Sequence, residues 1–222
     1  PGFDTVGAEE RERLDGYFPI RVGNPVSADK LIAAQIDLER EMRDTGYPFA
    51  NVGEEDVLVD HDRREADLTQ PITPGPRLRF GAVLAQDDGL LGARHIQRIA
   101  RFDPGEWYSQ AMVEDLRRAL IATGLVASVG IEPVQASDPA AVDLNVSITP
   151  APLRTLAGAI GYGTGEGFRA EASWEHRNLF PPEGALILRG VAGTQEQLAS
   201  VTFRRSNFMV RDRVLAVQAL AS

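Results

Sequence analysis

Two stretches of this chain recur at a nearly constant spacing. The sequence ITPGPRLRFGA begins at Ile72, and the related sequence ITPAPLRTLAGA begins at Ile148, 76 residues later. A Thr-Gly pair shows a similar spacing, since Thr45 and Thr123, each followed by glycine, lie 78 residues apart. Two matches in register indicate a structural unit of about 75 residues that occurs twice.

The first unit, residues 18–76, has the pattern of a strand, a helical region and two further strands. We expect a strand at 18–22, a helix that Ser27 caps and that runs to about Asp44, and strands near 56–60 and 65–72. Gly46 stands where a helix stop is expected. The apolar face of the predicted helix consists of Leu31, Ala34, Leu38 and Met42.

The second unit, residues 77–152, repeats this order more clearly. It predicts a strand at 79–84, a helix at 93–101, a second helix between the cap Ser109 and the stop Gly124, and strands at 127–132 and 142–149. The second helix carries Met112, Val113, Leu116 and Leu120. Both units therefore read β-α-α-β-β, and the fold class predicted for this part is α+β.

Beyond Pro152 the helical spacing gives way to alternation of apolar and polar residues. From Phe168 to Glu175, for example, apolar residues alternate strictly with Arg, Glu and Ser. The pattern predicts five antiparallel strands in residues 153–222. The glycine-rich stretch GYGTGEGF, residues 161–168, fits a turn between two of them rather than a phosphate loop, because Glu166 replaces the third glycine of that motif.

Such strands fit two architectures. In a soluble sandwich the apolar faces turn inward, whereas in a membrane barrel they face lipid and the polar faces line the lumen. Alternation alone leaves both open.

The composition narrows the class of partner. The 222-residue chain has a net charge of −9, and all of this excess lies in residues 1–75, which hold 17 acidic and 8 basic side chains. An acidic region of this kind disfavours binding to nucleic acid. The absence of cysteine excludes disulfides. The opening PGFDTVGAEERER lacks the apolar core of a secretion signal, so we expect any localisation signal to lie outside a chain that is a piece of a longer protein.

Catalysis finds little support in the residues. His61 lies between Asp60 and Asp62, which could suggest a metal site, but adjacent residues on a strand point to opposite faces, so a polar turn between two strands is expected instead. His95 is expected on a solvated helix face, and His176 near a strand end. Glu171 and Glu175 could imitate a pair of glycosidase carboxylates, but in a barrel their strand face is the polar lumen. No serine occupies a GxSxG motif.

The pieces together resemble a known superfamily. GYPFANV, PGPRLRFGAV and FDPGEWYSQAMVEDLRRALIATGLVASVGIEP look like POTRA domains of the TamA/BamA superfamily of outer-membrane assembly factors, and PLRTLAGAIGYGTGEGFRAEASWEHRNLF looks like the start of its β-barrel. The resemblance covers residues 18–222 and is closest to the TamA branch. It implies an N-terminal tail or the stub of a preceding domain at 1–17, POTRA domains at 18–76 and 77–152, and the first strands of an incomplete barrel at 153–222.

The resemblance also implies a function without catalysis or a cofactor. Members of this superfamily sit in the Gram-negative outer membrane, with POTRA domains in the periplasm, and help to insert or export client proteins. The partners implied are unfolded client proteins, outer-membrane lipid and a membrane-tethered periplasmic protein similar to TamB.

Two sets of site residues follow from the resemblance. The first barrel strand would be the seam that pairs with a client strand, and its candidate residues are Leu156, Gly158, Ile160, Gly161, Tyr162 and Gly163. The candidate POTRA docking edge consists of Val57, Leu58 and Val59. Exposed strand edges are templates for other chains, and glycines weaken a strand interior.

Two other functions remain open. A two-partner-secretion transporter shares the barrel superfamily, and a periplasmic scaffold would bind partners through its POTRA units without inserting them. In each case five strands cannot close a barrel of the family's diameter, so we expect residues 153–222 to be held by something outside this segment.

Overall fold

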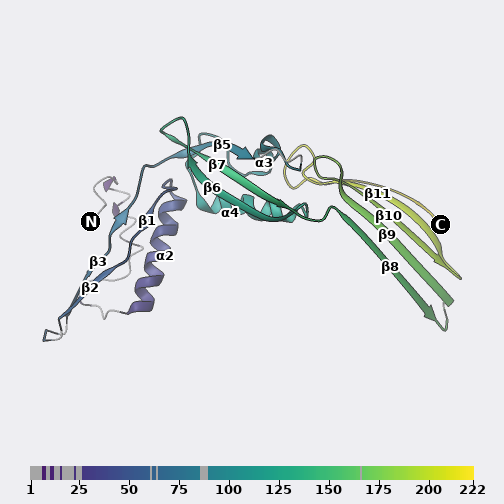
Figure 1. Cartoon of the computed structure of the whole chain (residues 1–222), viewed down its shortest axis with the longest axis horizontal. Helices are drawn as coiled ribbons and strands as arrows, with labels where there is room; N and C mark the ends of the chain where they lie inside the picture. The colour runs from purple at the N-terminus through teal and green to yellow at the C-terminus, as the bar shows by residue number, and fades with distance from the viewer. Residues whose placement is uncertain are drawn as a thin grey trace. The chain divides into compact units, whose positions relative to one another are not determined.

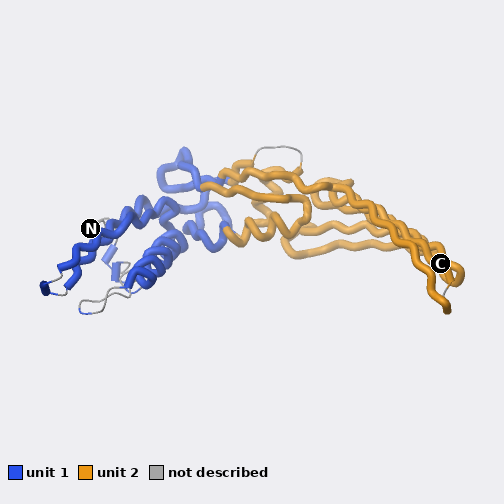
Figure 2. The backbone as a smooth tube through the Cα atoms, turned by 60° about the horizontal axis from the view of Figure 1, so that its bottom comes forward, with its two compact units in different colours: residues 1–82, 102–113, 133–144 blue, residues 83–101, 114–132, 145–222 orange. Residues whose placement is uncertain are grey.

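The computed structural model describes most of the chain. The described residues are Gly7, Ala8, Arg11, Glu12, Gly16, Gly23 and 27–222, except for 61, 64, 86–89 and 166. The predicted strand at 18–22 and His61 therefore lie outside the described residues. The chain forms two compact units, one of residues 1–82, 102–113 and 133–144, the other of residues 83–101, 114–132 and 145–222 (Figure 2). The predicted domain boundaries stay a prediction.

The first helix follows its predicted apolar face. Helix α2 spans Ala28–Asp44 and buries Leu31, Ala34, Leu38 and Met42, as the spacing predicts. Ser27 occupies the N-cap position, but its side chain makes no capping hydrogen bond, contrary to the prediction. The helix ends where Thr45 donates its hydroxyl to the carbonyl oxygen of Glu41, and Gly46 follows at a φ of 111°. A side chain at Gly46 would be strained at that angle.

Short strands accompany this helix. Strand β1 (Asn51–Val52) pairs with β4 (Ile72–Thr73), and β2 (Asp56–Asp60) forms an antiparallel hairpin with β3 (Glu65–Thr69). The single strand predicted at 65–72 is thus two strands, because Pro71 lacks the N–H that a continuous ladder needs. A buried cluster joins the end of the helix to β1 and β4, and it consists of Leu38, Met42, Tyr47, Ala50, Val52 and Ile72.

The second repeat has the predicted order of elements. Strand β5 (Arg79–Ala85) is followed by α3 (Ala93–Ile99), α4 (Gln110–Ala122), β6 (Val126–Gln135) and β7 (Ala141–Pro150), and the three strands form a sheet in the order β5-β7-β6 (Figure 1). Val113, Leu116 and Leu120 of α4 are buried, whereas Met112, predicted on the same face, is 36% exposed at its border.

One prediction about α3 is wrong. His95 is buried rather than solvated, because its ring binds the carboxylate of Glu183, 2.6 Å from Nε2. A buried polar ring needs a partner of this kind. The neighbouring Arg94 and Arg98 are exposed, as a basic helix face predicts.

The C-terminal part is the predicted five-stranded antiparallel meander. Its strands are β8 (Arg154–Gly163), β9 (Gly167–Phe180), β10 (Gly184–Gly193), β11 (Gln197–Arg205) and β12 (Leu215–Ala221), in sequential order (Figure 1). The glycine-rich stretch begins in the end of β8 and runs into the start of β9, where Gly167 has a φ of 77°. The fold class is therefore confirmed: an α+β region precedes an antiparallel sheet. No helix in the described part of the chain is long and apolar enough to cross a membrane.

Candidate functional site

Strand β8 lies at one edge of the C-terminal sheet, and β12 lies at the other. Among the described residues no strand pairs with the outer edge of β8. All six predicted seam residues lie on this strand. Its pairing with β9 is regular, since the register runs without a shift from Arg154 opposite His176 to Gly163 opposite Gly167.

Hydrogen bonds at the two ends of β8 and β9 fix which backbone groups face outward. Arg177 donates its N–H to the carbonyl of Leu153 (2.8 Å), so residue 153 bonds toward β9. Thr194 donates to the carbonyl of Phe168 (2.9 Å), so Phe168 bonds toward β10 and not toward its partner Tyr162. Residues of an antiparallel pair alternate between these two orientations. The odd-numbered residues of β8 therefore bond to β9, and the even-numbered ones point outward.

This alternation divides the predicted seam residues into two groups. Leu156, Gly158, Ile160 and Tyr162 direct their N–H and C=O groups to the open edge, whereas the backbone groups of Gly161 and Gly163 point toward β9. Close packing does not require glycine at positions 158 and 161. A Cβ atom at Gly161 would meet nothing within 4 Å, and one at Gly158 would be 3.5 Å from the nearest atom. Their effect is thus on the stability of the strand itself.

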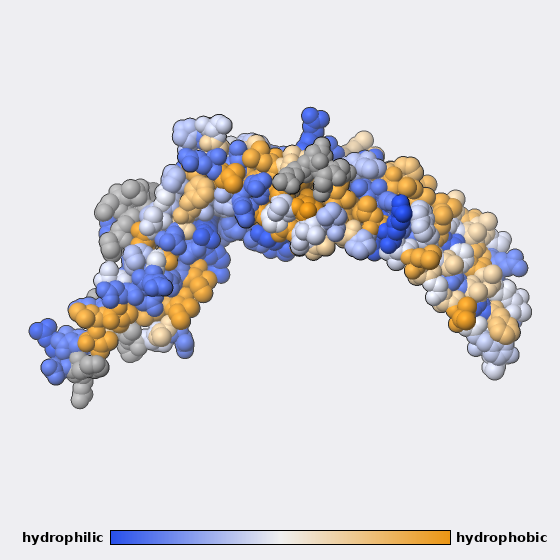
Figure 3. All heavy atoms as spheres, viewed as in Figure 1, coloured by the Kyte–Doolittle hydropathy of each residue, from blue (hydrophilic) through white to orange (hydrophobic). Residues whose placement is uncertain are grey.

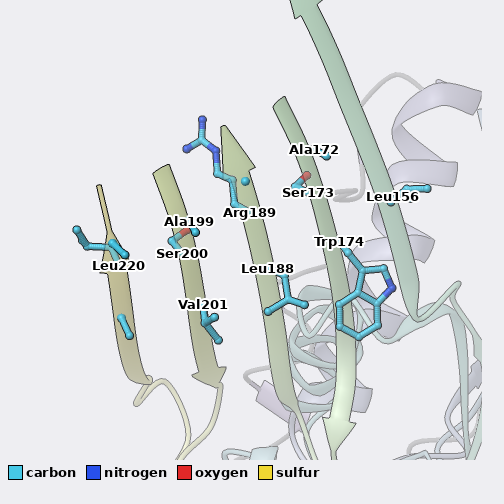
Figure 4. Close-up of a pocket in the computed structure, with 13 residues that line it drawn as sticks. Leu156, Ala172, Ser173, Trp174, Leu188, Arg189, Ala199, Ser200, Val201 and Leu220 are labelled. Atoms are coloured by element: carbon cyan, nitrogen blue, oxygen red, sulfur yellow. The ribbon is translucent and has the colours of Figure 1, made fainter. Parts of the chain in front are cut away.

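The residues of β8 whose backbone groups point to the open edge have their side chains on one apolar face of the sheet. The register places Leu156, Trp174, Leu188, Val201 and Ala219 in a single row across the five strands. Figure 4 shows Trp174, Leu188 and Val201 on neighbouring strands, around a shallow depression of about 640 Å³. Apolar side chains also show over this sheet in the space-filling view (Figure 3).

No described element covers this apolar face. Leu156 is 80% exposed and Ile160 is 91% exposed, which is unusual for large aliphatic side chains in water. A sandwich would bury them against a second sheet. Within the described residues, the exposure of the face therefore favours the barrel architecture over the sandwich.

Aromatic side chains lie toward both ends of these strands. The rings of Tyr162 and Phe168 are 4.8 Å apart beside the β8–β9 turn, and those of Phe180 and Phe203 are 5.6 Å apart at the opposite end. Between them the face is rich in alanine and glycine. An apolar band between two aromatic girdles is typical of strands that cross a membrane.

The other face of the sheet is polar and ion-paired. Arg189 donates to Glu171 (2.7 Å), and Arg169 lies 3.7 Å from Glu171 and 3.3 Å from Glu196. Glu175 lies 3.9 Å from Arg177. Both carboxylates that could imitate a glycosidase pair thus have arginine partners. No group of three His, Asp or Glu side chains among the described residues could hold a metal ion.

Arg177 fixes the start of the edge strand, and sequence reasoning missed it. Its guanidinium donates to the carbonyl of Pro152 (3.0 Å) and to the hydroxyl of Thr155 (3.1 Å). The first residues of β8 are therefore tied to β9. The one local sign was an arginine near the end of a predicted strand, which is common and does not point to a role.

The second predicted site lies on β2. Val57, Leu58 and Val59 occupy the middle of this strand, which pairs with β3, and Leu58 is 70% exposed. In the second repeat the corresponding strand is β6, which lies at the edge of its sheet. The repeat thus supports an edge position for β2. The two predicted sites lie on separate strands, β8 and β2.

No protein-family model matches the chain. Its structure is similar to the crystal structure of BamA from Haemophilus ducreyi lacking POTRA domains 1–3, with a TM-score of 0.82 and 17% identity over 96% of this chain and 40% of that one. It is also similar to Haemophilus influenzae BamA POTRA3-5, with a TM-score of 0.50 and 19% identity over 63% of this chain and 54% of that one.

The chain thus spans less than half of the length of the first of these structures. At these identities the likeness concerns the fold. The chain combines a POTRA-like α/β region with an antiparallel sheet that matches a fragment of the BamA barrel.

Proposed function

We propose that this chain is part of an outer-membrane assembly factor of the TamA type, which helps to insert or export client proteins by pairing with their strands. The observation that carries the proposal is the open edge of β8. It offers a regular series of outward-directed N–H and C=O groups, at residues 156, 158, 160 and 162, beside an uncovered apolar sheet face.

The membrane supplies the physical reason. In hydrocarbon an unpaired backbone group costs several kcal/mol, since no water replaces the missing hydrogen bond. An edge strand there needs a partner strand, either from the remainder of its own barrel or from a client. Glycine at 158 and 161 lowers the stability of β8, so that exchange between the two partners becomes less costly.

The proposed location is the outer membrane, with the two α/β repeats in the periplasm. Outer-membrane lipid would cover the apolar face of β8–β12. Unfolded clients would pair with β8 and with the edge of β2 at Val57, Leu58 and Val59. A tethered periplasmic protein similar to TamB is a further proposed partner.

The test uses proline at two adjacent positions of β8 in the full-length protein. Proline removes one N–H donor. Ile160→Pro removes a donor from the open edge, whereas Ala159→Pro removes one from the ladder with β9. We expect Ile160→Pro to lower client insertion into lipid vesicles several-fold while the thermal stability stays close to that of the wild type. Ala159→Pro should lower the stability.

Ile160→Val is the matched control, since it keeps the donor and the apolar side chain. It should retain full insertion activity. Equal insertion by Ile160→Pro and Ile160→Val would remove the edge of β8 from the mechanism. A protein that exports one dedicated substrate and inserts no others would be a two-partner-secretion transporter, and one that binds clients without inserting them would be a scaffold.

The POTRA edge has its own test. Leu58→Ser should change the free energy of unfolding by less than about 0.5 kcal/mol, because the side chain is exposed. It should nevertheless weaken the binding of unfolded client peptides. Unchanged binding would exclude the Leu58 side chain from docking.

A further inference from the structure

Glu183 is a buried acidic residue in the turn between β9 and β10. It is 4% exposed, and its φ of 60° is unusual for a residue other than glycine. Its carboxylate oxygen Oε1 lies 2.6 Å from Nε2 of His95 on α3. The turn is thereby bonded to a helix 88 residues earlier in the chain.

The same residue holds the next turn of the sheet. Asn207, in the loop between β11 and β12, donates from Nδ2 to both carboxylate oxygens at 2.9 Å. The backbone N–H of Glu183 donates to Oδ1 of Asn178 near the end of β9 (2.9 Å). One side chain therefore joins α3 to two turns that are separate in sequence.

The burial of this carboxylate makes its donors essential. A buried charge is stable only when it is paired and hydrogen-bonded, and removal of one partner leaves it uncompensated. The bond requires a proton on Nε2 of His95, since this ring nitrogen faces the carboxylate, whereas Nδ1 is buried without a hydrogen-bond partner among the described groups.

A more exposed set of ion pairs lies beside this contact. Arg211 of the β11–β12 loop donates to Asp115 of α4 (2.5 Å), and Arg101, just after α3, donates to Asp212 (3.0 Å). These pairs join the same loop to both helices. The Arg101–Asp212 pair is exposed and contributes little, whereas the Arg211–Asp115 pair is partly buried. The contact of Glu183 is more deeply buried than either pair, and of the three it alone bonds to the turn between β9 and β10.

We propose that Glu183 is a lock between α3 and the turns of the sheet, so that the helix and the turn ends of β9–β12 move as one body. Without the bond from His95, the turns would shift relative to α3. The lock does not depend on client insertion, so it can be tested in the full chain without a client.

Spin-label distances test the lock directly. The chain has no cysteine, so labels can be placed at Arg94→Cys on α3 and Val210→Cys in the β11–β12 loop, both exposed. His95→Gln keeps an amide N–H near the position of Nε2, whereas His95→Leu keeps the volume and removes the donor. We expect a narrow distance distribution for the wild type and His95→Gln, and a broadened, shifted one for His95→Leu.

If apolar packing alone held the helix, the order would reverse, with His95→Leu narrow and His95→Gln broad. That result, or equal widths in the two variants, would overturn the proposal. Asn207→Asp provides a second measurement on the other side of the lock. Aspartate, like asparagine, tolerates the positive φ of 49° at this position, but it places a carboxylate against that of Glu183. This variant should therefore also broaden the distance distribution. A narrow distribution for Asn207→Asp would overturn the proposal.

Discussion

The carboxylate of Asp44, the last residue of α2, accepts a hydrogen bond from the backbone N–H of Ala111 in the first turn of α4, at 2.6 Å. Asp44 also lies 3.4 Å from the hydroxyl of Ser109. An acid from the first repeat thus caps a helix of the second, where its negative charge meets the positive end of the helix dipole.

Loss of this cap should destabilise the protein. We expect Asp44→Ala to lower the free energy of unfolding by about 1 kcal/mol, as loss of a helix cap does. Chemical denaturation of the full chain measures this. Asp37→Ala on the same helix is the control, since Asp37 forms an exposed pair with Arg40, and it should change the stability by less than about 0.5 kcal/mol. Equal effects would contradict the capping role.

The buried face of α4 should contribute more to the free energy of unfolding than the cap does. Leu116 is fully buried, so Leu116→Ala should cost roughly 2–5 kcal/mol in the free energy of unfolding. Met112→Ala, at the border of the same face, should cost clearly less. A loss below about half a kcal/mol for Leu116→Ala in chemical denaturation would refute this helix-face assignment.

The Arg211–Asp115 pair should make the stability depend on pH. The hydrogen bond from Arg211 lowers the pKa of Asp115 below its usual value of 3.8. A lowered folded-state pKa stabilises the protein above the unfolded value, and the contribution disappears as the pH falls through the folded value. We expect Arg211→Gln to be less stable than the wild type at pH 7, and the difference to shrink as the pH falls below 3.8 and to vanish below the lowered folded-state pKa of Asp115. A pH-independent difference would contradict this linkage.

The uncovered sheet face should cause association in water. With Leu156 and Ile160 so exposed, the chain of 222 residues should form oligomers or aggregates in detergent-free buffer and disperse in detergent. Light scattering in both buffers tests this. A stable monomer without detergent would mean that the apolar faces are buried internally, as in a sandwich.

The glycine at position 161 can be replaced without a clash. Because a Cβ atom there would meet nothing within 4 Å, Gly161→Ala should stabilise β8 by about 0.5–1 kcal/mol. If a weak β8 favours strand exchange, the same variant should slow client insertion. Thermal unfolding and the insertion rate, measured on one preparation, test both parts, and a faster insertion would contradict the role of the glycine.

The sequence by itself determined the local elements, because their cause is local. The spacing of Leu31, Ala34, Leu38 and Met42 predicts the buried face of α2, and alternation predicts the five strands of the sheet. The repeat at Ile72 and Ile148 predicts two α/β units with the same order of elements. The prediction of one strand at 65–72 was wrong, because Pro71 interrupts the pattern between β3 and β4.

Only the tertiary structure decided the contacts between distant elements. Nothing near His95 in sequence signals that it is buried, since its partner Glu183 lies 88 residues away in a turn that looks solvent-exposed. The outward direction of the backbone at Leu156 and Ile160 likewise follows from bonds that Arg177 and Thr194 make. Alternation shows which side chains share a face, but it does not show which backbone groups remain unpaired, because that depends on which strand lies on each side.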